Sequence, residues 1–166
     1  MQKICVGILM LCLYGTAQGY IVDGTRINRP SMLSYAKSKL QNRGIIEQGL
    51  DGLAYLKVPE NYITELHRQI LLPGYELPNQ TQISIINQHE AKNIVNFQEL
   101  GRTIEFRPLG FYTVVVDDQE FFMLAIDAPE LSTLRQKYGL SANLEDHSFN
   151  IAIGVKKLTA HEEARG

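Results

Sequence analysis

Short stretches in which apolar and polar residues alternate are separated in this chain by stretches with helical spacing. Alternation with a period of two predicts strands, and apolar residues three and four positions apart predict helices. The pattern predicts helices at residues 31–40, 90–97 and 129–138, and one that begins at Pro59-Glu60 and ends before Pro73. It predicts strands at residues 53–58, 83–86, 103–107, 111–116, 120–126 and 149–155. Strands that alternate with helices, together with a hairpin signal at Asp117-Asp-Gln119, favour an α+β fold.

Two segments of the chain have the same order of predicted elements. In each, an apolar strand leads to Pro-Glu and a helix, and the strand that follows begins with a carboxamide side chain, Gln82 or Asn150. Pro is tolerated in the first turn of a helix, and Glu interacts favourably with the positive end of the helix dipole. This repetition predicts two pseudo-symmetric β-α-β lobes that form a central groove within one domain. The alternative is that a strand, a proline, a helix and a second strand are a common order of elements, so that the two segments need not be related.

The N-terminal residues have the features of a secretory signal peptide. Lys3 supplies one positive charge, residues 4–14 are apolar apart from Gly7, and small residues follow at cleavage-site spacing up to Gly19. Both cysteines, Cys5 and Cys12, lie in this segment, so the expected mature chain contains no disulfide. Export without disulfides favours a bacterial protein that is secreted or periplasmic. An uncleaved anchor is the alternative.

Length and charge limit the classes of function. The chain has 166 residues, which suits one domain with its own core, and its formal net charge of −2 gives no reason to expect binding to duplex nucleic acid or, after signal removal, to a membrane. We divide it into a signal peptide, an N-terminal arm with a short helix, a folded domain and a polar tail, at residues 1–19, 20–50, 51–158 and 159–166.

Across Asp51 to Lys157 the chain resembles the 2H phosphoesterase superfamily, most closely its bacterial stand-alone branch. In that family each of two lobes ends in a strand with a His-x-Thr/Ser motif, and the two strands lie side by side in a groove. The resemblance places Gln82 and Asn150 at the two His positions. It places Ser84 and Ala152 at the two hydroxyl positions, so that both histidines and one hydroxyl are replaced.

The replacement changes the chemistry that the resemblance implies. In the family, one histidine takes a proton from the attacking hydroxyl or water and the other protonates the leaving oxygen of a phosphodiester. Carboxamides form hydrogen bonds but do not titrate near neutral pH. Each lost proton-transfer role costs roughly 10²–10⁴ in rate. The expected function is therefore a catalytically impaired protein that binds a nucleotide or phosphate ester through Gln82, Ser84 and Asn150, without a cofactor.

Other residues provide alternatives. His147 lies three positions before Asn150 and is the candidate catalytic residue of an active phosphodiesterase with a displaced site, with His89 as a second choice. Tyr112 could line the groove and stack on a base, although packing in the core or on the strand surface is the favoured interpretation. Arg102 and Arg107 could reach a phosphate or form solvated ion pairs.

Two further hypotheses concern metals and partners. His89-Glu90 lacks the second histidine of the zinc-protease motif, so we predict no metal site. A different class of function is an exported protein-interaction module with a vestigial groove, which would bind a protein partner.

Overall fold

A computed structural model of the chain describes residues 24–50, 52–79, 82–144 and 147–159, which form a mixed α+β fold. The predicted signal segment and residues 160–166 lie outside the described residues. The helices are α1 (Pro30–Lys39), α2 (Glu60–His67), α3 (Gln88–Ala91) and α4 (Pro129–Lys137). The strands are β1 (Thr25–Ile27), β2 (Arg43–Gln48), β3 (Ala54–Lys57), β4 (Gln82–Ile86), β5 (Thr103–Glu105), β6 (Arg107–Val116), β7 (Gln119–Asp127) and β8 (Asn150–Lys157).

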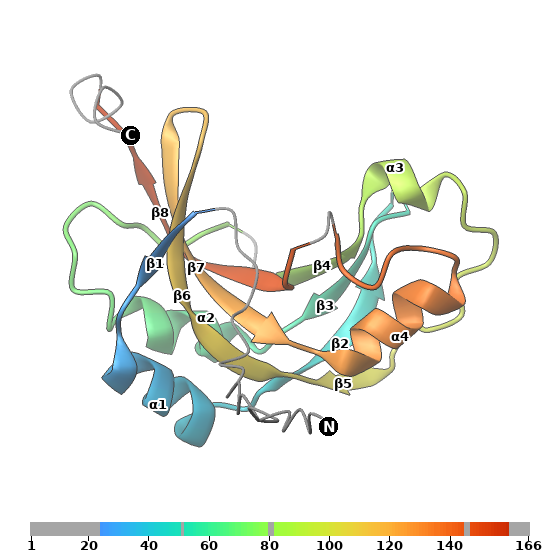
Figure 1. Ribbon diagram of the computed structural model, residues 1–166, viewed down its shortest axis with the longest axis horizontal. Coiled ribbons are helices and arrows are strands. Elements are labelled where there is room, and N and C mark those ends of the chain that lie inside the picture. Colours follow the sequence, from blue (N-terminus) through green and yellow to red (C-terminus); the bar gives the residue numbers. More distant parts are fainter. Residues whose placement is uncertain (1–23, 51, 80–81, 145–146, 160–166) are drawn as a thin grey trace, which may run out of the picture.

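The strands form two four-stranded antiparallel sheets. The strand order is β1-β6-β7-β8 in one sheet and β4-β3-β2-β5 in the other. Strands β4 and β8 are therefore edge strands, and they contact each other where the two sheets meet (Figure 1).

The two sheets have the same connectivity. In one, β3 and β4 pair and α2 lies between them in sequence; in the other, β7 and β8 pair around α4 in the same way. The outer strands are exchanged, because β1 pairs with β6 while β5 pairs with β2. The helices also cross over, since α2 contacts β8 and α4 contacts β4. The N-terminal and C-terminal halves of the chain are thus interlocked.

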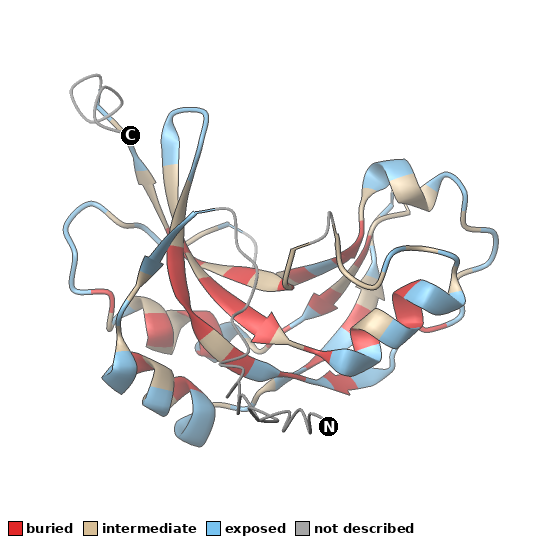
Figure 2. Cartoon of the chain, in the orientation of Figure 1, coloured by how far each residue is buried: buried red, intermediate tan, exposed pale blue. Residues whose placement is uncertain are grey.

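The core occupies the region where the strands and helices meet, and Figure 2 shows buried residues concentrated along the strands there. Tyr62 and Phe106 pack edge to face with ring centroids 5.6 Å apart, and Phe111 packs against Phe122 at the same separation. Burial of each large apolar side chain stabilises the fold by about 1.5–3 kcal/mol. In the part of the chain that the structure describes, no helix is both long and apolar enough to cross a membrane.

The sequence pattern located α2, α4 and the hairpin. Helix α2 begins directly after Pro59 and α4 begins at Pro129, as predicted, although α2 ends earlier, at His67. Helix α4 ends before Gly139, whose φ of 74° is favourable for glycine. Val116 pairs with Gln119, so the predicted hairpin is confirmed with Asp117 at a φ of 54°.

Other boundaries differ from the predictions. Helix α1 covers Pro30–Lys39 instead of residues 31–40, and Arg29 is its N-cap residue. Helix α3 covers Gln88–Ala91 instead of residues 90–97, because the Asn87 side chain caps its first turn. The segment at residues 20–50, interpreted as an arm with a short helix, also supplies β1 and β2. Strand β2 begins at Arg43, in a stretch for which the sequence pattern predicted no strand.

Candidate functional site

Strand β4 presents its polar residues on one face. Ile83 and Ile85 are completely buried, whereas Ser84 is exposed and Gln82 is half-buried. Successive side chains of a strand point to opposite faces, so Gln82 and Ser84 share the face that points away from the core. The apolar residues between them fix this orientation, because a shift of one residue would expose both isoleucines.

Strand β8 is oriented in the same way. Ile151 and Ile153 are completely buried, whereas Asn150 before them and Ala152 between them are half-buried. The register pairs Asn150 with Ala125 and Ala152 with Met123 of β7. Since β4 and β8 are contacting edge strands, their polar faces border the same region of the surface.

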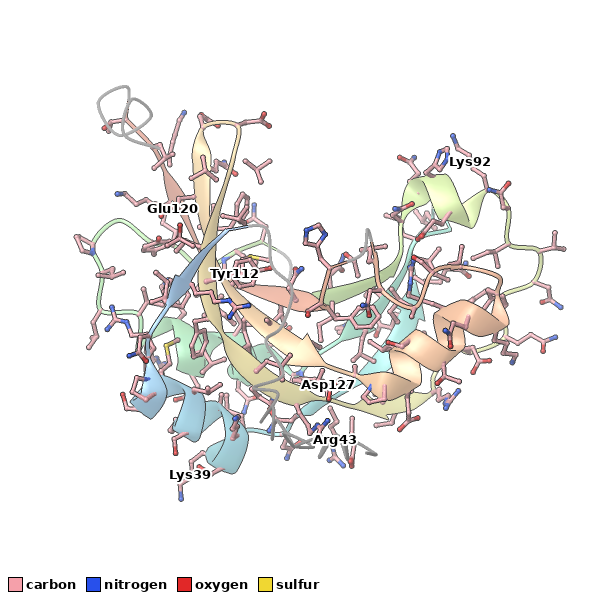
Figure 3. The ribbon with its side chains drawn as sticks, in the orientation of Figure 1. Lys39, Arg43, Lys92, Tyr112, Glu120 and Asp127 are labelled. Atoms are coloured by element: carbon pink, nitrogen blue, oxygen red, sulfur yellow. The ribbon has the colours of Figure 1, made fainter. Side chains whose placement is uncertain are left out.

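A groove of about 300 Å³ lies at this border. Ser84, Tyr112, His147 and Asn150, four residues that the sequence selected, line it together. They come from β4, from β6 and from the segment that leads into β8; Figure 3 shows Tyr112 on the part of β6 beside β1. The other lining residues are Val114, Val116, Met123, Leu144, Ser148 and Phe149.

Two of the four motif residues, Gln82 and Ala152, are not among those that line the groove. Gln82 lies at the start of β4, opposite Lys57 of β3, and Ala152 lies one pleat further along β8 than Asn150. The structure therefore brings together Ser84, from the first motif, and Asn150, from the second.

Tyr112 lines the groove mainly as a wall. Its side chain is buried, with an exposed fraction of 4%, and its strand neighbours are Arg26 of β1 and Met123 of β7. A ring with so little exposed surface offers little area on which a base could stack. The stacking role that the sequence suggested for Tyr112 therefore stays a prediction that requires the ring to become more exposed.

The segment before β8 folds locally around His147. The His147 amide donates to the Leu144 carbonyl over 3.0 Å, and Nδ2 of Asn150 donates to the Ser148 carbonyl over 3.4 Å. These contacts place the half-buried His147 side chain beside the groove, three positions before the Asn150 carboxamide.

The other described histidines lie outside this groove. His89 is exposed on α3, while Nε2 of His67 lies 3.2 Å from the Tyr75 carbonyl, to which the ring can donate. His161 lies outside the described residues. His147 is therefore the described histidine that lines the groove beside Ser84 and Asn150.

Arg135 is a residue of the site region that the sequence analysis missed. It lies on α4 and is completely buried, and its guanidinium contacts both Glu90 and the Ile85 carbonyl of β4. The helical spacing could have identified Arg135 as a buried residue. It follows Leu131 by four residues and Leu134 by one, and it therefore lies on the apolar face of the helix. A charged residue on that face requires buried partners.

A second, larger cavity of about 630 Å³ lies on the other side of the segment that leads into β8. It shares Ser148 and Phe149 with the groove and is also lined by Arg107 and Asp127, which form an ion pair. Arg102 pairs with Glu99 and Glu130. The ion-pair alternative for Arg102 and Arg107 is thus confirmed. The larger cavity does not contain the motif residues, so we assign the candidate site to the smaller groove.

Comparisons with protein-family models, curated proteins and solved structures found no match for this chain. In the described part of the chain, no three His, Cys, Asp or Glu side chains are grouped so that they could hold a metal ion. The chemistry of the site must therefore be argued from its own residues.

Proposed function

We propose that this protein binds a nucleotide or another phosphate ester in the groove beside β4 and β8. We further propose that it has a 2H phosphoesterase-like architecture in which carboxamides replace the motif histidines. The observation that carries the proposal is that Ser84 and Asn150, one from each motif, line the same groove as His147. The common connectivity of the two sheets supports two equivalent lobes.

The groove residues match such a ligand chemically. Hydroxyls of Ser84 and Ser148 can donate hydrogen bonds to phosphate oxygens, and the Asn150 carboxamide can both donate to and accept from a ribose or a base edge. Val114 and Met123 provide an apolar wall for a ring. Apolar walls with a few polar groups are typical of small-molecule sites.

The same residues limit catalysis by the family's route. Asn150 and Gln82 do not titrate near neutral pH, so they cannot act as the general acid and the general base. Two lost proton-transfer roles, at roughly 10²–10⁴ each, leave a protein whose main activity is binding.

Ligand-induced stabilisation tests this proposal. We expect adenosine 2′,3′-cyclic monophosphate or adenosine monophosphate, at about 100 times its Kd, to raise the Tm by roughly 5–10 °C. Ser84→Ala and Asn150→Ala should each reduce this shift at the same ligand concentration, because each removes a hydrogen-bonding group from the groove. Thermal melting with and without ligand measures the effect.

Ser38→Ala is the matched control, since Ser38 is exposed on α1 and its hydroxyl bonds the Ser34 carbonyl of the same helix. It should keep the full ligand-induced shift. The proposal is wrong if no phosphate ester changes the Tm of the wild type, or if the groove variants respond as Ser38→Ala does.

A second candidate function is a phosphodiesterase that uses His147. The observation in its favour is that His147 lines the groove together with Ser84, so an imidazole and a hydroxyl face the same bound ligand. One imidazole can supply a general base or a general acid in a given step, worth about 10²–10⁴ in rate.

Turnover of 2′,3′-cyclic nucleotides distinguishes the second candidate from simple binding. We expect an active wild type to lose at least about 100-fold of its kcat/KM in His147→Ala, because the proton-transfer group is removed. His89→Ala should retain full activity, since His89 is exposed on α3 outside the groove. A wild type without turnover excludes this candidate while leaving the binding proposal intact.

A further inference from the structure

Arg135 of α4 is a completely buried charge that is hydrogen-bonded to the β4 side of the groove. Its Nη1 donates to the backbone carbonyl of Ile85, the neighbour of Ser84 in β4, and to Oε2 of Glu90 over 3.0 Å. Its Nη2 donates to Oε1 of Glu90 over 2.7 Å. The two parallel bonds to Glu90 form the bidentate arrangement for which a guanidinium is suited.

The same guanidinium is hydrogen-bonded to the turn that leads to the other side of the groove. Its Nε donates to the Ser141 carbonyl over 2.8 Å, and Nη2 donates to the Asn143 carbonyl over 3.2 Å. The Ser141 hydroxyl also donates to the Asn143 carbonyl, over 2.6 Å, which closes the turn. Leu144, the next residue, lines the groove, and so does His147.

Glu90 is itself held in place relative to β4. It belongs to a capping box at the start of α3, in which its amide donates to Oδ1 of Asn87 over 2.9 Å and its Oε2 accepts from the Asn87 amide over 3.1 Å. Partial burial would raise the pKa of the Glu90 carboxyl, but the hydrogen bonds from Arg135 and Asn87 outweigh it and lower the pKa. At neutral pH the pair is therefore ionised.

The energetic cost of this arrangement indicates a role in geometry. Transfer of a charge from water into the interior is expensive, and a buried ion pair gives little net stability over apolar packing of the same volume. The pair instead fixes geometry. The five N–H donors of a planar guanidinium point in fixed directions, so the acceptor groups must lie along those directions. Here the partners are β4, α3 and the Ser141–Asn143 turn.

We propose that Arg135 is a positioning residue that fixes the Ser84 side of the groove relative to the side formed by His147 and Asn150, and so determines which ligands can bridge both sides. This inference rests on the proposed ligand-binding function of the groove. A ligand that contacts both sides needs the correct separation between them, whereas a small anion that contacts one side does not.

Three variants test the proposal. Arg135→Lys keeps the charge but removes the planar fork, and Glu90→Gln retains the capping box because Gln serves at this position as Glu does. The double variant Glu90→Gln/Arg135→Met removes both charges and leaves no unpaired ion. Arg68→Met is the control, since Arg68 forms an exposed ion pair with Glu65 on α2, the helix equivalent to α4.

Amide hydrogen exchange measures the positioning without a ligand. We expect the amides of Ser141 to Leu144 and of His147 to Asn150 to exchange at least tenfold faster in Arg135→Lys and in the double variant. Amides of β6 and β7 should exchange as in the wild type, which shows that the fold is intact. Glu90→Gln should show a smaller change in the same direction, and Arg68→Met none.

Ligand selectivity provides a readout that a merely structural role would not change. We expect the Kd for adenosine 2′,3′-cyclic monophosphate to rise at least tenfold in Arg135→Lys. The Kd for inorganic phosphate, which is higher in the wild type, should change less than twofold. Wild-type exchange at these amides in Arg135→Lys and in Glu90→Gln would overturn the proposal, and so would faster exchange with an unchanged nucleotide Kd. If the wild type binds neither ligand, the proposed function fails and the selectivity proposal fails with it, whereas the exchange result still reports whether Arg135 positions the turn.

Discussion

The ionisation of Glu99 is linked to the stability of this protein. It is buried, with an exposed fraction of 8%, and accepts hydrogen bonds from Nζ of Lys137 over 2.6 Å and from Nη1 of Arg102 over 3.0 Å. These bonds, the one from Lys137 foremost, lower the pKa of the Glu99 carboxyl below its ordinary value of 4.5 despite the burial. Through Lys137, Glu99 attaches the loop after α3 to helix α4.

The lowered pKa predicts acid lability. Because the unfolded chain takes up a proton at Glu99 at higher pH than the folded chain, the stabilisation is complete above pH 4.5 and is lost as the pH falls through the folded pKa. We expect Glu99→Gln to lower the Tm at pH 7 by about 2–4 °C and to flatten its decline between pH 6 and pH 3.

Thermal melting across this pH range measures the effect. Glu105→Gln, a substitution of an exposed carboxylate on β5, should follow the wild-type curve. A Glu99→Gln protein that declines as steeply as the wild type would show that other carboxylates are responsible.

At the residue scale, the sequence identified the neutral polar residues of the groove more readily than the charged residues that hold them. Ser84 and Asn150 stand at equivalent positions of a visible repeat, and His147 lies close to Asn150, so a sequence pattern was sufficient to select them. Two of the partners of Arg135 lie 45 positions away at Glu90 and 50 positions away at Ile85, and single-sequence periodicity contains no information about such distant contacts.

At the scale of elements, strands with a strict alternation and helices with a proline start were predictable. Strand β7 and helix α4 have these signals, because buried Phe122 and Leu124 alternate with the more exposed Phe121 and Met123, and Pro129 then begins the helix. The two-residue turn at Asp117-Asp118 was also predictable, since Asp tolerates a positive φ.

Strands β1 and β2 were not predictable for physical reasons. Strand β1 has three residues, two of them exposed, so it lacks a hydrophobic pattern. Strand β2 contains Gly44, which β propensity disfavours, yet a Cβ at this position would lie 2.6 Å from the Lys57 carbonyl oxygen. The close approach of β3 therefore requires a glycine at this position. The same glycine makes β2 difficult to recognise from the sequence. Helix α3 was misplaced because its cap, Asn87, is adjacent to an apolar strand and not to a polar loop.

At the scale of the whole molecule, the interlocked halves predict a single cooperative folding unit. A fragment of residues 1–100 contains β1 without its partner β6, β2 without β5, and α2 without the β8 surface that it contacts. We expect this fragment alone to show no cooperative thermal transition by circular dichroism, because these elements lack part of their packing surface.

Addition of residues 101–166 should restore the transition, since that fragment supplies β5, β6 and β8. The mixture of the two fragments is thus the control for the isolated fragment of residues 1–100, because it contains the same residues as the intact chain. A cooperative transition in residues 1–100 alone would instead show that the N-terminal half is an independent domain.

The exchange of β1 also has a consequence for the chain while it is being made. Thr25 pairs with Thr113, so the first strand lacks its β6 partner until a residue 88 positions further along the chain has left the ribosome. At ordinary rates of synthesis this wait is on the order of 10 s. Pairing between such distant segments is slow because a long loop must close first. The sheet of β1, β6, β7 and β8 is therefore complete only after β8, at Asn150–Lys157, has been made, and until then the apolar residues of β6 and β7 lack part of their packing surface.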